Sequence, residues 1–176
     1  MSRLPPRITL RAATDADGPA LIAAHRASTG LHAPWVAPFT DMAGFRNWRA
    51  GHAAGIAAGF LAEDGDSGAL VGVTNLSQIV MKAFCSAYMS YWGIAGVTGG
   101  GRMTEAVRLT LWRGFRVIGL HRIEANIQPG NAPSLALVRR LGFRHEGFSP
   151  RYLKIDGDWR DHERFAILAE EFETGK

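Results

Sequence analysis

Polar and apolar residues alternate at the start of the chain and then change to a helical spacing. Residues 7–11 alternate between the two classes, which predicts a strand with one buried face. Thr14, followed three residues later by Asp17, resembles a helix N-cap, and the helix is expected to run to about Ser28. Gly30 stands near the expected helix end, where a left-handed residue is easily placed.

A proline-containing loop separates this helix from the next one. Residues 31–40 hold prolines and Trp35, which favours a loop. Residues 41–58 are expected to form a second helix, because Phe45, Trp48 and Ile56 recur near one face.

Three strands are expected in the middle of the chain. Residues 59–63 and 69–75 have strand-like patterns, and the polar, glycine-containing segment 64–68 between them is typical of a hairpin turn. Residues 85–94 form a longer strand candidate.

Glycines, a helix and further strands complete the pattern. Residues 96–101 contain four glycines. The elements expected after them are a helix from about Met103 to Gly114 or beyond, a strand at 121–127, a helix at 131–141 stopped by Gly142, strands at 143–147, 152–155 and 159–169, and a turn at Asp156–Gly157. The order β-α-α-β-β-β-α-β-α-β-β predicts a mixed sheet with helices on its faces, in one domain spanning residues 1–176.

Composition favours a soluble cytoplasmic protein, and a monomer or a homodimer is expected. The 176 residues are 47% hydrophobic, enough for a packed core, and no apolar run or leader-like segment predicts a membrane span or a secretory signal. The single cysteine, Cys85, excludes an internal disulfide, and the six histidines show no metal-ligand spacing. The formal charge of +4 suits an anionic ligand. Scattered, mixed charges indicate solvated faces rather than a nucleic-acid site.

The glycine segment is the strongest candidate for ligand chemistry. Glycines leave the backbone N–H groups free to turn toward one point, and the following helix adds its own N–H groups and a positive dipole end. This combination suits a phosphate or pyrophosphate. No lysine follows the glycines, as a triphosphate-binding loop requires, and Thr104 stands where the dinucleotide motif needs its last glycine. Coenzyme A pyrophosphate remains as a ligand, with a simple helix-capping turn as the alternative.

A second candidate site begins the next helix. Asn131 is a suitable N-cap and Pro133 suits the first turn, so these residues alone indicate only a well-formed helix start. In a β-α-β-α unit, however, this helix start and the glycine segment lie at the same sheet edge, where ligands of open α/β sheets bind. Ser134 would then present a hydroxyl to a bound cofactor.

These two segments together resemble the GCN5-related N-acetyltransferases. The family's pyrophosphate loop, Gln/Arg-x-x-Gly-x-Gly/Ala, corresponds to residues 98–103, and its Asn-x-x-Ala/Ser pattern, with a later Gly-Phe, corresponds to Asn131, Ser134 and Gly142-Phe143. The chain most resembles the ribosomal-protein-alanine N-acetyltransferase branch. The segments that carry this resemblance are Pro34-Trp35, residues 71–77, residues 121–126, Leu141-Gly142-Phe143, Glu146-Gly147 and residues 155–162.

The resemblance implies a fold and a cofactor. The implied fold is a mixed, mostly antiparallel sheet of six to seven strands, with a V-shaped splay between two parallel strands and helices on both faces. The implied co-substrate is acetyl-CoA, and no metal is implied. The expected cofactor-binding residues are Trp92, Gly93, Ile94, Thr98, Gly99, Gly100, Gly101, Arg102, Met103, Thr104, Asn131 and Ser134.

Several positions depart from the family pattern. Thr98 replaces the usual Gln or Arg, and Val138 stands where many members have a tyrosine general acid, so the resemblance passes that role to Ser134. Leu153 stands where some members of the branch have a glutamate general base, which leaves the base undecided. Asn126 is expected either to hold a catalytic water or to bond the backbone at the core edge. The Gly93–Ile94 backbone N–H groups are expected to stabilise the oxyanion.

Aromatic and polar side chains are candidates for the acceptor entrance, although most aromatic residues belong to cores. His162 beside Asp161 does not predict a dyad, because adjacent strand residues point to opposite faces. The expected substrate-binding residues are Trp35, Asn75, Phe84, Tyr88 and Trp159.

Three functions remain open from the sequence. The first is acetylation of a protein N-terminal α-amine, in particular an alanine of a ribosomal protein. The second is acetylation of a small amine such as a polyamine or an antibiotic. The third is a non-catalytic acyl-CoA sensor, which Val138 and Leu153 keep open. The acceptor cleft distinguishes these functions, because the fold is common to them.

Overall fold

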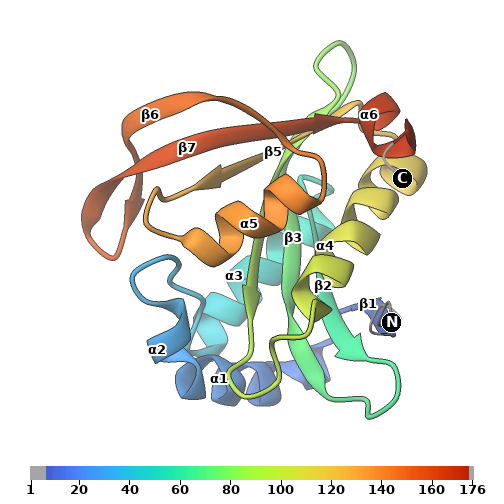
Figure 1. Cartoon of the computed structure of the whole chain (residues 1–176). Coiled ribbons are helices and arrows are strands. Elements are labelled where there is room, and N and C mark those ends of the chain that lie inside the picture. Colours follow the sequence, from blue (N-terminus) through green and yellow to red (C-terminus); the bar gives the residue numbers. More distant parts are fainter. Residues whose placement is uncertain (1–6, 175–176) are drawn as a thin grey trace, which may run out of the picture.

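One seven-stranded sheet organises the computed structural model, which describes residues 7–174. The strands lie in the order β1-β2-β3-β4-β5-β7-β6 (Figure 1). Their bounds are Ile8–Ala12 for β1, Ala57–Asp64 for β2, Leu70–Val80 for β3, Ser86–Gly93 for β4, Arg122–Ile127 for β5, Arg144–Ile155 for β6 and Asp158–Leu168 for β7.

Helices cover both faces of this sheet. Figure 1 shows α4 and α5 in front of the strands, whereas α3 lies behind them. The bounds are Gly18–Ala27 for α1, Thr29–His32 for α2, Met42–Ala53 for α3, Arg102–Arg113 for α4, Ala132–Arg140 for α5 and Ala169–Thr174 for α6. A 3-10 turn, Asp15–Asp17, precedes α1, and a π-helical turn, Gly114–Ile118, extends α4.

The strand directions confirm the expected mixed, mostly antiparallel sheet. Every neighbouring pair is antiparallel except β4 and β5, which run parallel. The chain between the parallel strands β4 and β5 forms the helix α4, because a parallel pair needs a long crossover connection. Short turns are enough for the antiparallel pairs β2–β3 and β6–β7.

Several element boundaries differ from the sequence prediction. The second helix ends at Ala53, because Gly55 has a φ of +72° and Ala57 already pairs with Ser77. Gly30 lies inside the short helix α2 and does not end a helix in a left-handed conformation. The two strands predicted between residues 143 and 155 form one strand, β6, which is interrupted by register shifts near Gly147 and Ser149. The terminal helix α6 was not predicted.

The largest hydrophobic core lies between the sheet and the helices α4 and α5. Its fully buried members include Leu111 on α4, Val138 on α5 and Ile123 on β5. A second core packs α1 and α3 against the opposite face, through Phe45 and Val73 among others. Val138 is therefore a core residue, and an apolar side chain without a hydroxyl suits this buried position.

The parallel strands β4 and β5 separate part of the way along their length. Their pairing ends at Met89 and Ala125, although β4 continues to Gly93 and β5 to Ile127. Beyond that point, each strand keeps only its outer neighbour, β3 or β7. The expected V-shaped splay is thus present, and it opens a gap in the middle of the sheet.

A buried hydroxyl pair between β3 and α4 yields a stability prediction. Thr110 Oγ1 donates to the Ala106 carbonyl at 2.9 Å and lies 2.7 Å from Thr74 Oγ1, so the Thr74 hydroxyl must donate to Thr110. Thr110→Val would leave the Thr74 donor buried without a partner, at a cost of about 1–3 kcal/mol. Urea unfolding should show this loss. Thr74→Val should cost less, because Thr110 keeps Ala106, and the opposite ranking would contradict the assigned donor.

Candidate active site

A cavity of about 520 Å³ occupies the splay, a volume within the usual range for a ligand pocket. It lies between the ends of β4 and β5, the glycine loop, the start of α5, and α2 with the loop that follows it. Most of the predicted cofactor and catalytic residues meet here. The predicted residues in its wall are Trp35, Trp92, Gly93, Thr98, Gly99, Gly101, Arg102, Met103, Thr104, Asn126, Asn131 and Ser134.

Two predicted cofactor residues and four predicted substrate residues lie outside the cavity wall. Gly100 belongs to the same loop as its lining neighbours, whereas the Ile94 side chain is buried in the protein. Phe84 precedes β4 at the strand end remote from the cavity. Trp159 lies beside the β6–β7 turn and is 60% exposed.

Asn75 and Tyr88 are engaged in the protein itself. The Asn75 side-chain oxygen accepts a hydrogen bond from the Trp48 indole at 2.6 Å, and Asn75 is buried. The hydrogen bond that Tyr88 shares with Tyr152 raises the Tyr88 pKa to about 12, with burial as the second cause. Both side chains therefore bond to other side chains of the protein, and neither lines the cavity.

The glycine loop has the backbone geometry that an anion site needs. Gly99, Gly100 and Gly101 have φ values of 121°, 56° and 85°, which side-chain-bearing residues rarely adopt. Within residues 7–174, none of their three N–H groups donates to a backbone acceptor. Gly101 is the N-cap of α4, and the Arg102 N–H donates to the Gly99 carbonyl at 3.1 Å. The Met103 and Thr104 N–H groups of the first helical turn lie beside this loop and donate to no backbone acceptor within residues 7–174.

Two arginines supply positive charge at this end of the cavity. Arg102 is held through its Nε atom by Asp64 at 3.1 Å. The backbone N–H of Ser67 is the main cause that lowers the Asp64 pKa to about 2, and Arg102 adds to it. Arg140, from the last turn of α5, donates to the Thr104 hydroxyl at 3.3 Å. Arg140 was not predicted, because only packing brings the end of α5 to the start of α4.

The edge of β4 leaves backbone groups facing the splay. The Ile94 N–H donates to the Val71 carbonyl at 2.8 Å, which removes it from the predicted oxyanion donors. Because N–H and C=O directions alternate along an antiparallel strand, the Gly93 groups face the opposite edge. The Gly93 carbonyl indeed accepts from His32 Nε2 at 2.8 Å, so the Gly93 N–H is the donor that remains.

The start of α5 presents Ser134 to the cavity. The Asn131 side chain caps this helix by accepting from the Ser134 N–H at 3.2 Å. The Tyr91 hydroxyl lies 3.5 Å from the Ser134 carbonyl oxygen, and burial is the main cause that raises the Tyr91 pKa to about 12. Tyr91, which was not predicted, therefore stays protonated and links β4 to α5 across the splay.

The other side of the cavity is polar but carries no carboxylate. The Asn126 side-chain oxygen is buried and lacks a hydrogen-bond partner within residues 7–174. Gln128 donates to the Pro34 and Trp35 carbonyls at 3.0 and 3.2 Å, which holds Trp35 in the wall. His162 also lines the cavity. Among the described residues of the wall, none is Asp or Glu.

The described part of the chain contains no group of side chains that could hold a metal ion. In the same residues, no helix is long and apolar enough to span a bilayer.

Comparisons with known proteins agree with this geometry. Residues 7–144 match the Acetyltransferase (GNAT) domain family. The chain is 37% identical over 125 residues to the [Ribosomal protein uS5]-alanine N-acetyltransferase of Escherichia coli, covering 71% of this chain and 64% of that protein. The first curated relatives are matched over 55–64% of their own length.

Solved structures share the fold over nearly the whole chain. Mycobacterium smegmatis RimJ in complex with CoA-disulfide has a TM-score of 0.85 and 34% identity, covering 96% of this chain and 85% of that one. The ribosomal-protein-S5-alanine acetyltransferase from Vibrio fischeri has a TM-score of 0.81 and 25% identity, covering 94% of both chains. With the splayed strands, the glycine loop and the matched domain in agreement, the chain belongs to the GNAT acetyltransferase family.

Proposed function

We propose that the protein transfers the acetyl group of acetyl-CoA to the N-terminal α-amine of a protein, with an alanine of a ribosomal protein as the acceptor. The observation that supports this most is the division of one cavity into an anion-binding end and a neutral polar end. The names of the E. coli, V. fischeri and M. smegmatis relatives support the same acceptor class.

The residues at the anion-binding end suit coenzyme A. The amides of Gly99, Gly100 and Gly101 and the guanidinium groups of Arg102 and Arg140 would hold the diphosphate. The free edge of β4 offers backbone partners for the amides of the pantetheine arm, as an added strand would use them. The thioester would then lie near the start of α5.

The neutral end of the cavity suits an uncharged amine. A peptide α-amine has a pKa near ~8, so roughly a tenth of it is neutral at pH 7 and can attack the thioester carbonyl directly. The Gly93 N–H would stabilise the oxygen that becomes negative. Ser134 would donate a proton to the departing sulfur. Asn126 lies in the same part of the wall, and its buried side-chain oxygen, unpaired among the described residues, would hold the amine or a water once the side chain turns toward the cavity.

The absence of carboxylates in the described wall favours a peptide over a polyamine. A polyamine keeps at least one ammonium group near the site, and a desolvated cation needs a carboxylate partner. A peptide N-terminus needs no such partner once its amine is neutral. Two alternative functions must be separated from this proposal by experiment: acetylation of a small uncharged amine, and a non-catalytic role as an acyl-CoA sensor.

Thiol release from acetyl-CoA tests the acceptor. A peptide that begins with alanine should release thiol with saturation kinetics, whereas the same peptide with a blocked N-terminus should release none. Turnover with spermidine but not with the peptide would indicate a small-amine enzyme. Tight binding of acetyl-CoA without turnover on either compound would indicate a sensor and contradict the proposal.

Mass spectrometry of protein N-termini would identify the acceptor in cells. Deleting the gene should remove the acetyl group from one ribosomal protein, and an unchanged profile would argue against this acceptor. The proposal also includes a cytoplasmic location and a monomeric or homodimeric state, which fractionation and light scattering can test.

A further inference from the structure

His162 occupies a buried position beside the acceptor end of the cavity. It lies on β7, is 2% exposed and contributes to the cavity wall. Asn126 pairs with Arg164 across β5 and β7, so continuing this register places His162 opposite Gln128. Residues two apart on a strand share a face, so His162 lies diagonally across from Asn126 on one face of the sheet.

The hydrogen bonds of His162 determine which ring nitrogen can act as a base. Its Nδ1 lies 2.9 Å from the Arg160 carbonyl oxygen, which can only accept, so Nδ1 carries the hydrogen. In the neutral ring, Nε2 therefore holds a lone pair. Within the described chain Nε2 makes no hydrogen bond, and it is not sealed from the cavity as the Asn126 oxygen is.

The surroundings keep this imidazole neutral. Burial is the main cause that lowers the His162 pKa, while the Arg160 carbonyl and the charge of Asp161 act weakly in the opposite direction. The Asp161 carboxylate is itself bound to the Arg151 N–H at 2.7 Å. On β7, the charged groups near the ring are Asp161, Arg160 and Arg164. Tyr152 on β6 has a ring-centroid separation of 6.0 Å from His162, and His32 on α2 lies in the same cavity wall. The neighbouring residues Asn126 and Gln128 are neutral.

We infer that His162 is the general base that accepts a proton from the acceptor amine through Nε2. This inference rests on the acetyl transfer proposed above. As the amine nitrogen bonds to the acetyl carbon and the carbon–sulfur bond breaks, one proton passes from nitrogen to His162, and Ser134 donates one to the sulfur. His162 then releases its proton to water and Ser134 recovers one, so no net proton is gained or lost.

Other side chains in the described chain are less suited to this role. Leu153, where some related enzymes have a glutamate, cannot accept a proton. Both nitrogens of His25 are engaged, one with the Phe39 carbonyl and one with the Trp92 indole. His32 is fixed to the Gly93 carbonyl on β4, on the cofactor side of the cavity, and it is the rival that the experiment must exclude.

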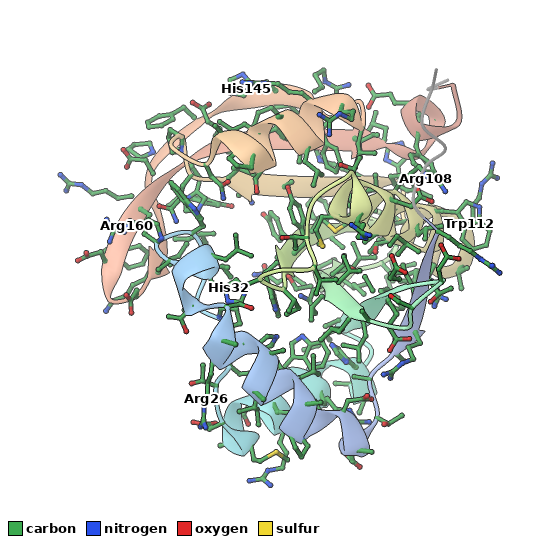
Figure 2. All side chains as sticks on the ribbon, turned by 60° about the horizontal axis from the view of Figure 1, so that its bottom comes forward. Arg26, His32, Arg108, Trp112, His145 and Arg160 are labelled. Atoms are coloured by element: carbon green, nitrogen blue, oxygen red, sulfur yellow. The ribbon has the colours of Figure 1, made fainter. Side chains whose placement is uncertain are left out.

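The first test replaces His162 with asparagine, whose side-chain amide can still donate to the Arg160 carbonyl. With the alanine peptide at pH 7, kcat/KM should fall by at least about tenfold while acetyl-CoA binds with unchanged affinity. His145→Asn is the matched control, because His145 lies on the outer side of β6, far from His32 and the cavity (Figure 2). Unchanged turnover by the folded His162→Asn protein would overturn the inference.

The second test measures the pH dependence of the wild-type protein, with His32→Asn as a control, and applies even if the His162→Asn variant does not fold. The logarithm of kcat/KM should rise with pH at a slope of one below the amine pKa of about 8. The slope should increase to two at lower pH, below the His162 pKa, which burial holds under the usual value of 6.5. A slope of one at every pH at which the protein stays folded would overturn the inference. His32→Asn should keep the steeper slope, and its loss there would assign the base to His32. Absence of any turnover by the wild type would instead contradict the proposed function.

Discussion

Ser134→Ala is expected to lower kcat with the alanine peptide about 100-fold at pH 7, the size typical of a lost general acid. The serine hydroxyl faces the cavity at the start of α5, and the position of the family's tyrosine is taken by the buried Val138. The Asn131 cap accepts from the Ser134 backbone N–H, which alanine keeps. The variant should therefore fold and bind acetyl-CoA normally, so the loss should appear in kcat.

The pH dependence distinguishes proton donation from a change of shape. A thiol has a pKa of about 8.5, so a leaving thiolate needs less help as the pH approaches that value. The deficit of Ser134→Ala should shrink between pH 7 and pH 9. Ser77→Ala, on β3 outside the cavity wall, is the matched control and should behave as the wild type. A deficit of constant size at all pH values would assign Ser134 a positioning role, with the neighbouring Tyr91 as the next donor to test.

Gly93→Ala is expected to weaken acetyl-CoA binding strongly, because there is no room for its methyl group. A Cβ atom at Gly93 would lie 2.0 Å from Thr98 Cγ2, in the turn that leads into the glycine loop. Thr98 Cβ would also lie 3.3 Å from the added methyl group, and the Thr98 N–H bonds to the Ile94 carbonyl, so we expect the clash to shift the loop. The clash would cost about 2 kcal/mol through overpacking. If the glycine loop shifts to relieve the clash, so that this cost falls on acetyl-CoA binding, the affinity should fall roughly 30-fold. Isothermal titration calorimetry measures this directly.

A second substitution tests the cause of that loss. Thr98→Ser removes the Cγ2 atom and keeps the hydroxyl, so the Gly93→Ala/Thr98→Ser double variant should recover most of the affinity. Thr98→Ser alone should bind nearly as the wild type, because in the proposed anion site the loop's backbone amides, which have no backbone acceptor in the described chain, contact the diphosphate. Equal losses of affinity in the single and the double variant would contradict this explanation, because the clash with Thr98 Cγ2 would then not be the cause of the loss.

Local sequence signals located the turns, the caps and the ligand loop. Asp156 and Gly157 adopt left-handed φ values of 52° and 87°, as expected for a hairpin turn between β6 and β7. Gly142, with a φ of 84°, follows α5 and ends it as expected. These positions were predictable because a backbone conformation that few residues tolerate limits the choice of residue at that position.

Strand position alone could not distinguish a cavity wall from a core. Trp92 and Tyr88 lie on the same strand, but Trp92 reaches the cavity whereas Tyr88 bonds to Tyr152 from a distant part of the chain. Asn75 is likewise engaged by Trp48, which lies on a helix of the opposite layer. Such partnerships depend on which elements pack together, and the periodicity of one strand carries no information about them.

The sequence by itself determined the class of this protein: the order of its elements, the glycines before α4, and Asn131 and Ser134 at the start of α5. Each of these features follows from local backbone preferences over a few residues. The tertiary structure alone decided that Arg140 joins the glycine loop, that Ile94 gives its N–H to β3, and that His162 lies in the cavity wall. The physical reason is that these contacts join segments far apart in the chain, and only the packing of helices and strands brings them together.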